Sequence, residues 1–471
     1  MLLPQLAQRV STNKRSCMPD HTVPTRQETA TEPSYGSVPQ PVHAASHNNH
    51  PRHSLKRLLG PGVVAGAADD DPSGIATYSQ AGAQFGFNQL WTVVLTLPFM
   101  IAIQMIAARI GRASGEGLMA AAARRSPPAL IVGIVVLVLF ANIINIAADL
   151  AAMGEALRLV VGGSDLFAKV MTVAFGLLCV VLEVVISYRR YAGALKWLTM
   201  VLFVYVIAVL TIKVPWLEVG RALVMPTISW TSDYALTMVA VFGTTISPYV
   251  FIWQAGQEVE ELKLHGAPAL RDTPLDQHGH INRIKWDTCI GMVFSNIISF
   301  AIILTTAATL HSQGIVTINT AAQAAEALRP IAGVLTFLLF ACGIIGTGLL
   351  AVPVLAGASA YAVSEALHWH ATLSAKPLDA IGFYGVIAAA TFGGVAITLI
   401  GIDPIRMLFW AAVINGFAAV PIMVGMMLLS CDTQTMGVWT LPRPLKIMGW
   451  IATGIMALAA CLLIGSELSG P

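Results

Sequence analysis

Long apolar stretches recur along this chain and constrain its fold more than any other feature of the sequence. From about residue 58 onward, runs of twenty or more mostly apolar residues alternate with short polar loops, and the run from Leu130 to Phe140 carries no charge. A helix of about twenty apolar residues spans the hydrocarbon core of a bilayer, whereas outer-membrane strands alternate strictly. The chain is therefore predicted to be an all-α integral membrane protein.

The composition supports this prediction and excludes several classes of protein. Hydrophobic residues make up 56% of the chain and charged residues only 11%, whereas a soluble domain carries about 25% charged residues. The net charge of +2 gives no indication of a nucleic-acid partner. The six cysteines are scattered without paired spacing, so neither a disulfide framework nor a thiolate metal site is expected.

The chain divides into two parts by composition. Residues 1–55 are rich in Pro, Ser, Thr, His and Asn, and no run of seven apolar residues there can serve as a signal-peptide core. We predict a disordered cytoplasmic tail at 1–55, followed by a transmembrane transporter domain at 56–471.

About eleven transmembrane helices are predicted in the second part. Their approximate ranges are 58–86, 89–110, 129–159, 166–188, 192–213, 234–257, 286–311, 329–364, 378–401, 405–430 and 446–466. The first range is the weakest by hydropathy because it contains three aspartates, so apolarity alone is also compatible with ten or twelve spans.

The positions of the basic residues predict the orientation. With eleven spans, the loops on the side of the N-terminus hold 21 of the 27 Lys and Arg residues and the opposite loops hold six. Because cationic loops are retained on the cytoplasmic side, the N-terminus is predicted to be cytoplasmic and the C-terminus external. The expected location is the plasma membrane, which the chain crosses many times.

Polar groups interrupt the first predicted helix near its centre. The segment at 69–74 reads Asp-Asp-Asp-Pro-Ser-Gly. Pro72 lacks an amide donor, Gly74 is a poor helix former, and three adjacent carboxylates cannot share one buried face. We predict that this segment is unwound, and ionisable groups at such a depth are candidates for function.

A second interruption lies in the sixth predicted helix, where residues 242–249 read Phe-Gly-Thr-Thr-Ile-Ser-Pro-Tyr. Two interrupted spans, each opening a block of five helices, are typical of an inverted-repeat transporter whose site lies at the midplane. Exposed carbonyl oxygens and carboxylates there would attract a cation. The alternative is a pair of ordinary proline kinks, with the aspartates in a water-filled vestibule.

The motif around the first interruption resembles the first helix of the NRAMP family of divalent-metal transporters. In that family, Asp-Pro-Gly-Asn is followed by Ala-Gly-Ala-Gln-Phe-Gly; here Asp71-Pro72-Ser73-Gly74 is followed by the same six residues at 81–86. The resemblance extends from about residue 58 to 466. It implies a LeuT-type fold, with helices 1–5 and 6–10 as inverted repeats and a metal ion between the breaks in helices 1 and 6.

The sequence departs from the family pattern at several ligand positions. The family aspartate aligns with Asp71, but the family asparagine falls on Gly74, and Met-Pro-His in helix 6 becomes Ser247-Pro248-Tyr249. The thioether that favours transition metals and the imidazole linked to proton handling are thereby lost. The resemblance also implies that the carbonyls of Ala68 and Thr244 are main-chain ligands.

A further departure lies in helix 3. The family motif Asp-Leu-Ala-Glu appears as Asp149-Leu150-Ala151-Ala152, so the glutamate implicated in proton transport is absent while the aspartate remains. This combination resembles the NRAMP-related magnesium transporters, a branch that takes up Mg²⁺ and Mn²⁺ without proton coupling.

The expected site is made of oxygen ligands. Such sites suit Mg²⁺, Mn²⁺ and Ca²⁺, whereas softer metals gain from nitrogen or sulfur. The predicted metal-site residues are Asp71, Ala68, Gly74, Thr244 and Ser247. The predicted outer-shell or pathway residues are Asp70, Tyr249, Asp149 and Asn415.

Two other polar groups have competing interpretations. Asn142, Asn145 and Asp149 share one face of the third predicted helix, which must look into the bundle or an aqueous path; interhelical hydrogen bonding and a transport role are both open. Glu155 lies three residues before Arg158, which predicts a surface-type ion pair near the helix end.

The function predicted from these features is divalent-cation transport across a membrane, of Mg²⁺ with Mn²⁺ accepted, driven by the electrochemical gradient without protons. The alternatives are a proton-coupled importer of Mn²⁺ or Fe²⁺ and, on the same fold, an amino-acid transporter. An enzyme is not expected, because the spans carry no Ser/His, Cys/His or His-rich constellation. The expected partners are metal ions, as substrate, and lipid. No cofactor, nucleic acid or obligatory protein partner is expected.

Overall fold

A computed structural model of the 471-residue chain describes residues 60–185, 200–229, 231–273, 278–370 and 372–468. The predicted tail at 1–55 and the first part of the predicted fifth helix lie outside the described residues. Residues Leu59–Pro471 form one compact unit, and the description below concerns this unit.

The helices of the first half follow the predicted order. The long elements are α2 (Pro61–Asp69), α3 (Pro72–Phe85), α4 (Leu90–Ser114), α6 (Pro128–Val161), α7 (Asp165–Val185) and α9 (Phe203–Thr211). The short ones are η2 (Gly86–Gln89), α5 (Leu118–Ala123), η3 (Met200–Leu202) and α10 (Trp216–Val224).

The second half repeats the pattern of a broken helix followed by continuous ones. The long elements are α11 (Ser232–Thr245), α12 (Pro248–Leu264), α13 (His278–Thr309), α16 (Thr336–Ala366), α17 (Ile381–Thr398), α18 (Pro404–Cys431) and α20 (Arg443–Leu468). The short ones are η4 (Leu270–Asp272), η5 (His311–Gln313), α14 (Ala321–Glu326), α15 (Arg329–Ala332), η6 (Gly333–Leu335), α19 (Thr433–Met436) and η7 (Gly437–Trp439).

The described residues contain nine helical stretches long and apolar enough to span a bilayer, or ten if the bent pair Met200–Thr211 and Trp216–Val224 counts as one span. One of the nine, Pro72–Ser114, has 43 residues, which is about 65 Å of helix and twice the hydrocarbon thickness. Gly86 interrupts it with a φ of +59°, so this stretch contains parts of both the first and the second predicted helices.

The predicted start of the eighth helix is wrong by seven residues. We expected it from residue 329, but the continuous helix α16 begins at Thr336. Gly333 has a φ of +50° and ends the short α15. A left-handed glycine terminates a helix because its lack of a Cβ removes the steric cost of that conformation, so the apolar run at 329–364 contains two helices.

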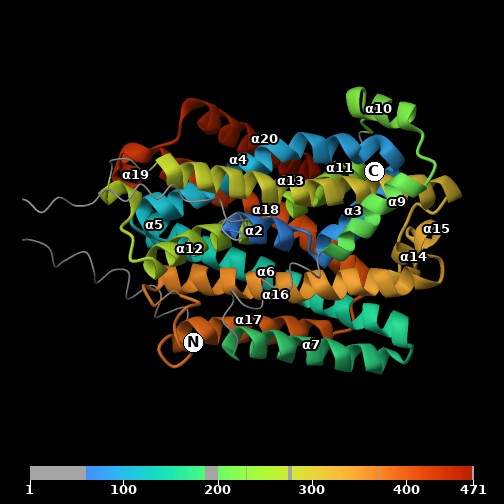
Figure 1. Cartoon of the computed structure of the whole chain (residues 1–471), viewed down its shortest axis with the longest axis horizontal. Helices are drawn as coiled ribbons and strands as arrows, with labels where there is room; N and C mark the ends of the chain where they lie inside the picture. Colours follow the sequence, from blue (N-terminus) through green and yellow to red (C-terminus); the bar gives the residue numbers. More distant parts are fainter. Residues whose placement is uncertain (1–59, 186–199, 230, 274–277, 371, 469–471) are drawn as a thin grey trace, which may run out of the picture. The chain divides into compact units, whose positions relative to one another are not determined.

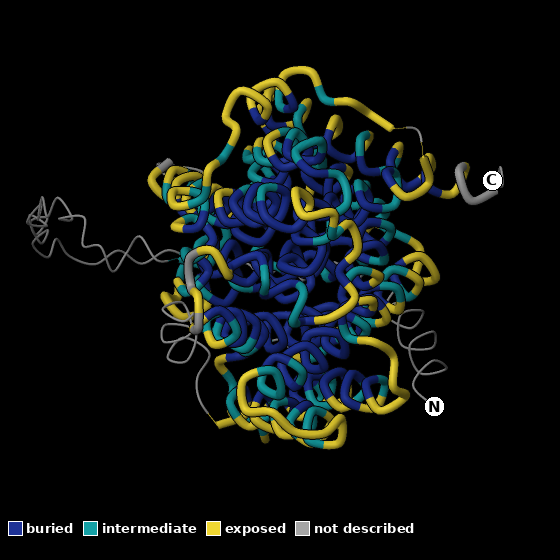
Figure 2. The backbone as a smooth tube through the Cα atoms, turned by 90° about the vertical axis from the view of Figure 1, so that its right-hand side faces the viewer, coloured by how far each residue is buried: buried dark blue, intermediate teal, exposed yellow. Residues whose placement is uncertain are grey.

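The bundle has two ends that differ in their connections (Figure 1). The α5 end carries α5 and α19, and the α14 end carries α10, α14 and α15. Figure 2, viewed from the α14 end, shows buried helices at the centre of the bundle and exposed connections in front of and around them. The interior brings α2, α3, α11 and α12 together with α6, α13, α16 and α18.

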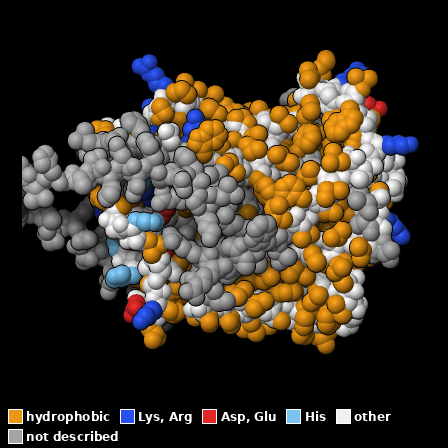
Figure 3. Space-filling model, in the orientation of Figure 1, with side chains coloured by type: hydrophobic (Ala, Val, Ile, Leu, Met, Phe, Trp, Pro, Cys, Tyr) orange, Lys and Arg blue, Asp and Glu red, His pale blue; other side chains and the backbone are white. Residues whose placement is uncertain are grey.

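The outer surface is apolar, as lipid contact requires. In α7, Leu166, Val170 and Val181 are exposed. Figure 3 shows hydrophobic side chains over much of the described surface, with Lys and Arg gathered toward the two ends. A surface of this kind is stable in a bilayer and not in water.

Candidate metal-binding site

The first break lies between α2 and α3, where the sequence predicts it. α2 ends at Asp69, Asp70 leaves the helical conformation, and Asp71 is the N-cap of α3 with a φ of −73° and a ψ of 169°. The Asp71 Oδ1 atom accepts a hydrogen bond of 2.7 Å from the Gly74 amide. Pro72 follows as the first helical residue, a position where its missing amide costs nothing. Asp71 is therefore held in place by the local sequence.

The second break lies between α11 and α12. Its second half-helix also begins with a proline, but the residue before that proline is neutral. α11 ends at Thr245, Ile246 has a non-helical ψ of 66°, and Pro248 is the first residue of α12. The Ser247 hydroxyl lies 2.7 Å from the Thr244 carbonyl oxygen and donates to it. The last carbonyl groups of α2 and α11 lie at the C-termini of these helices, where the helix dipole favours a cation.

The two breaks meet through Tyr249. Its hydroxyl donates to the Ala68 carbonyl oxygen at 2.9 Å and lies 3.2 Å from Asp71 Oδ2. On the other side of Asp71, a Cβ placed on Gly74 would lie 3.2 Å from the Thr244 hydroxyl oxygen. The predicted metal-site residues are therefore neighbours, and the phenol of Tyr249 bridges a predicted carbonyl ligand and the predicted carboxylate ligand.

Four carboxylates are buried around these breaks. Asp69, Asp70 and Asp71 are each 2% exposed, and Asp149 on α6 is fully buried. None of the four forms an ion pair with a described residue. Buried charges are costly unless they are paired, so this region is suited to bind cations.

Asp149 and Asp70 both lie near Asp71. Asp149 is close enough to Asp71 for their charges to interact, and the Ser73 amide lies near its carboxylate without forming a hydrogen bond of ordinary geometry. Asp70 instead contacts α13, where the Ser295 hydroxyl lies 3.0 Å from its Oδ1 atom and 3.3 Å from Asp69 Oδ2. Both carboxylates are therefore close enough to Asp71 to add negative charge beside it.

Asn415 is engaged with another helix. Its side-chain amide and that of Asn145 exchange two hydrogen bonds of 2.8 and 3.2 Å, which join α18 to α6. Asn142 donates to the Ser359 hydroxyl of α16 at 3.0 Å. The polar face of α6 looks into the bundle, as predicted, and interhelical hydrogen bonding accounts for both of its asparagines.

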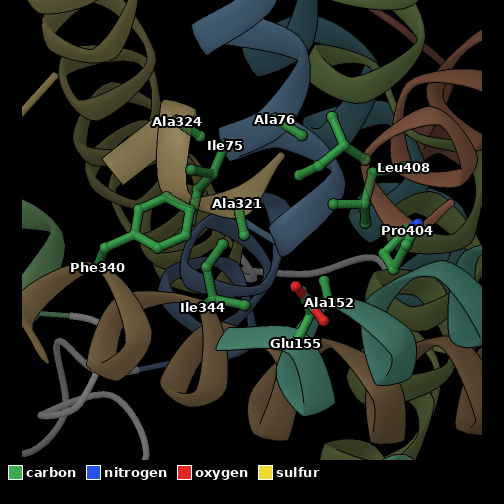
Figure 4. A pocket seen from close by; sticks show the side chains of 11 residues that line it. Ile75, Ala76, Ala152, Glu155, Ala321, Ala324, Phe340, Ile344, Pro404 and Leu408 are labelled. Carbon is green, nitrogen blue, oxygen red and sulfur yellow. The ribbon is translucent and has the colours of Figure 1, made fainter. Parts of the chain in front are cut away.

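The predicted pair of Glu155 and Arg158 is present, with 2.9 Å between Glu155 Oε2 and Arg158 Nε. Figure 4 shows the Glu155 carboxylate beside Ala152 at a small cavity of about 10 Å³. Ile75, Ile344 and Leu408 also line this cavity. Only about one water fits into such a volume.

Several hydrogen-bond partners of the residues at the two breaks were not predicted from the sequence. Ser295 lies in an apolar run of α13 and binds two of the aspartates, and Tyr78 of α3 lies 3.1 Å from the Thr245 hydroxyl of α11. The spacing of Ser295 and Ser299, one helical turn apart, is the sequence signal for a polar face there. In the part of the chain that is described, no group of three His, Cys, Asp or Glu side chains is arranged to hold a metal, so a bound ion would depend on hydroxyl and carbonyl oxygens as well.

Comparisons with known proteins agree with this geometry. The chain is 27% identical over 427 residues to the divalent metal cation transporter MntH of Klebsiella pneumoniae, which covers 87% of this chain and 94% of the relative. Among solved structures, the Eremococcus coleocola manganese transporter in complex with an aromatic bis-isothiourea compound is 19% identical and has a TM-score of 0.68. A variant of that transporter is 18% identical with a TM-score of 0.69, and each of the two structures matches 89% of both chains.

The expected fold, with its broken first and sixth helices, is therefore the fold of these structures. The natural resistance-associated macrophage protein-like (Nramp) family model matches residues 62–466, which include both breaks and all the long helices except the first residue of α2 and the last two of α20. The chain belongs to the Nramp family.

Proposed function

We propose that this protein transports divalent metal cations across a membrane, Mg²⁺ with Mn²⁺ also accepted, and that transport is uncoupled from protons. The observation that carries the proposal is the environment of Asp71. Its Oδ2 atom faces the phenol of Tyr249, where the family pattern has an imidazole, and the neighbouring candidate ligands are carbonyl and hydroxyl oxygens. An oxygen-only donor set favours hard dications.

The short side chains at the breaks favour an ion that keeps part of its water shell. Gly74 and Ser247 stand where the family pattern has Asn and Met, and both are shorter than those residues. Mg²⁺ dehydrates reluctantly and usually retains several waters in proteins. A site with one fixed carboxylate and few long side chains suits such an ion.

The membrane potential is sufficient to drive uptake. Each charge gains about 2.3 kcal/mol per 100 mV, so a dication gains about 4.6 kcal/mol, which corresponds to roughly a 2,000-fold accumulation. The side chains of Ala152 and Tyr249, at the two family positions linked to protons, do not titrate near neutral pH.

A second candidate function is proton-coupled import of Mn²⁺ or Fe²⁺. The buried carboxyl of Asp149, which lies next to Asp71 and pairs with no described cation, favours proton coupling. The relatives named as manganese or divalent metal transporters agree with Mn²⁺ as the substrate. An amino-acid substrate is disfavoured because its carboxylate would be repelled by the aspartates of the first break.

We also propose the orientation. The α5 end carries Arg112, Arg124, Arg125 and Arg271, and by the rule that cationic loops stay inside this end is cytoplasmic. The N-terminus would then be cytoplasmic and the C-terminus external, in a plasma membrane.

Reconstitution tests the proposal. Purified protein in liposomes is given Mg²⁺ or Mn²⁺ outside, an imposed inside-negative potential, and a pH dye inside. We expect voltage-driven uptake of both ions with unchanged internal pH. Acidification that accompanies Mg²⁺ or Mn²⁺ uptake and disappears in the Asp149→Asn variant would establish the proton-coupled alternative instead.

A further inference from the structure

A cavity of about 200 Å³ opens at the α14 end of the bundle. Its walls come from α3, the start of α11, the loop before α14 and the start of α18, and its floor includes Ala76 and Ile405. Gln80 fixes the loop, because its Oε1 atom accepts a hydrogen bond of 2.9 Å from the Ile318 amide. The cavity is therefore bounded by anchored segments.

The cavity lies along α3, the half-helix that Asp71 caps. Ala76 and Ile405 also line the 10 Å³ cavity next to Glu155, so the two cavities are neighbours. A space of about 200 Å³ holds several waters, whereas the smaller one holds about one. An ion in the large cavity can therefore keep its hydration shell, whereas the small cavity beyond Ala76 and Ile405 cannot hold a hydrated ion.

Two opposite charges line the cavity. Asp233 in the first turn of α11 and Arg406 in the first turn of α18 are the only ionisable residues among those that line it, and both are exposed. Neither forms an ion pair with a described residue. Gln84 and Asn319 add side-chain amide oxygens. The water ligands of a dication are strong hydrogen-bond donors, and carboxylate and amide oxygens are acceptors.

We propose that this cavity is a staging site, in which a hydrated divalent cation is held through its water ligands before it reaches Asp71. Asp233 attracts the ion, and Arg406 limits its affinity. The inference rests on the proposed transport of divalent cations, and it adds a second, outer-sphere site together with two residues that set the concentration dependence of uptake.

The charge of the ion gives the proposal a quantitative signature. Coulomb energy is proportional to the charge of the ion, and it is screened by salt at an exposed site. Removal of Arg406 should therefore strengthen binding of a trivalent ion more than that of a dication. We expect about a fivefold and a threefold effect, respectively, at low ionic strength, with both effects reduced at high salt.

The direct test uses cobalt(III) hexaammine, whose six ammine ligands do not exchange and which therefore imitates a hydrated ion that cannot be stripped. Its binding to the purified full-length protein is measured by titration calorimetry. We expect Arg406→Gln to strengthen binding about fivefold and Asp233→Asn to weaken it by a similar factor. Asp71→Ala should leave it unchanged, because the complex stays in the cavity.

Matched controls are available on α10 at the same end of the bundle. Arg221 and Glu218 are exposed and do not line the cavity. Arg221→Gln and Glu218→Gln should leave binding unchanged. Absence of hexaammine binding, equal shifts in these controls, or loss of binding in Asp71→Ala would each overturn the staging site.

A transport measurement separates this inference from the proposed function. Arg406→Gln should lower the Mg²⁺ concentration for half-maximal uptake about threefold at an unchanged maximal rate, and Asp233→Asn should raise it. If the wild-type protein transports no dication but binds hexaammine as described, the proposed function fails and the site stands. If transport is normal and the two variants leave its concentration dependence unchanged, the staging site fails alone.

Discussion

The two helix breaks have the same backbone design and different chemistry. Both place proline at the first residue of the second half-helix, after a capping residue in extended conformation. In the first break that residue is Asp71, and in the second it is Ser247. The first break therefore supplies the charge for a cation, while the second supplies neutral oxygens and the Tyr249 hydroxyl.

This difference indicates that the two breaks have different roles in cation binding. A carboxylate stabilises a dication through its full charge, whereas a hydroxyl or carbonyl contributes a dipole. The charge should control whether any cation binds, and the neutral side should control which cation binds. The following predictions test this division and then the packing of the two breaks, beginning with the largest effect.

The largest difference in Mg²⁺ uptake is expected between the variants Asp71→Ala and Ser247→Ala. We expect Asp71→Ala to reduce Mg²⁺ uptake at least 100-fold, because the dication loses its counter-charge in a low-dielectric site, and Ser247→Ala to reduce it only a few-fold. Uptake into liposomes gives the rates, and thermal melting verifies that both variants are folded. Normal flux in Asp71→Ala would remove the site assignment.

The selectivity among metal ions should depend on the second break, which supplies the neutral oxygens. Ser247→Met introduces a thioether and should shift preference from Mg²⁺ toward Mn²⁺ or Cd²⁺ by roughly tenfold, since softer metals prefer sulfur. Adding Gly74→Asn should enlarge the shift by narrowing the site.

The space at Gly74 is limited in a way that bears on this double variant. A Cβ there would lie 3.2 Å from the Thr244 hydroxyl oxygen and 3.3 Å from the Tyr78 ring, so both neighbours must move slightly. Gly74→Ala controls for this crowding. An unchanged Mg²⁺ to Mn²⁺ ratio in the double variant would mean that neither ligand softness nor size sets selectivity.

A smaller effect is expected from Tyr249→His. An imidazole has an ordinary pKa of about 6.5 and binds metals only when neutral. Mn²⁺ uptake by this variant should therefore be highest above pH 7 and fall about threefold as the pH drops to 6. The wild type, which has no imidazole at this position, should show no comparable change, and an equal pH profile in both proteins would assign the dependence to another group.

The smallest effect on transport is expected from two glycines at which the half-helices α2 and α11 pack closely against neighbouring helices. A Cβ on Gly66 would lie 2.3 Å from the Gly291 carbonyl oxygen of α13, and one on Gly243 would lie 2.1 Å from the Ala412 carbonyl oxygen of α18. Gly66→Ala and Gly243→Ala should each cost about 1 to 3 kcal/mol of stability through overpacking. Gly454→Ala on α20, where the space is open, is the control, and thermal melting is the measurement. Similar losses in all three variants would argue against these close contacts.

Much of this organisation could be predicted from local sequence. The apolar runs predict the helices, and Pro72 and Pro248 predict both breaks, because a missing amide and a fixed φ act within one turn. The capping role of Asp71 is also local, since its partner Gly74 lies three residues away. The early start predicted for the eighth helix shows the limit of hydropathy, which does not register a left-handed glycine inside an apolar run.

The partners of the polar groups depend on tertiary structure. Tyr249 and Asp71 are 178 residues apart, Asn145 and Asn415 are 270 apart, and Ser295 and Asp70 are 225 apart. Each pair meets only because packing places particular faces of different helices together, and a single sequence carries no measure of that distance. The sequence by itself therefore determined a membrane protein of broken and continuous helices with buried carboxylates, through backbone and hydrophobic effects that act locally. Only the packed structure decided which oxygen of Asp71 faces Tyr249, that Asp70 contacts α13, and that Asp233 and Arg406 line one cavity.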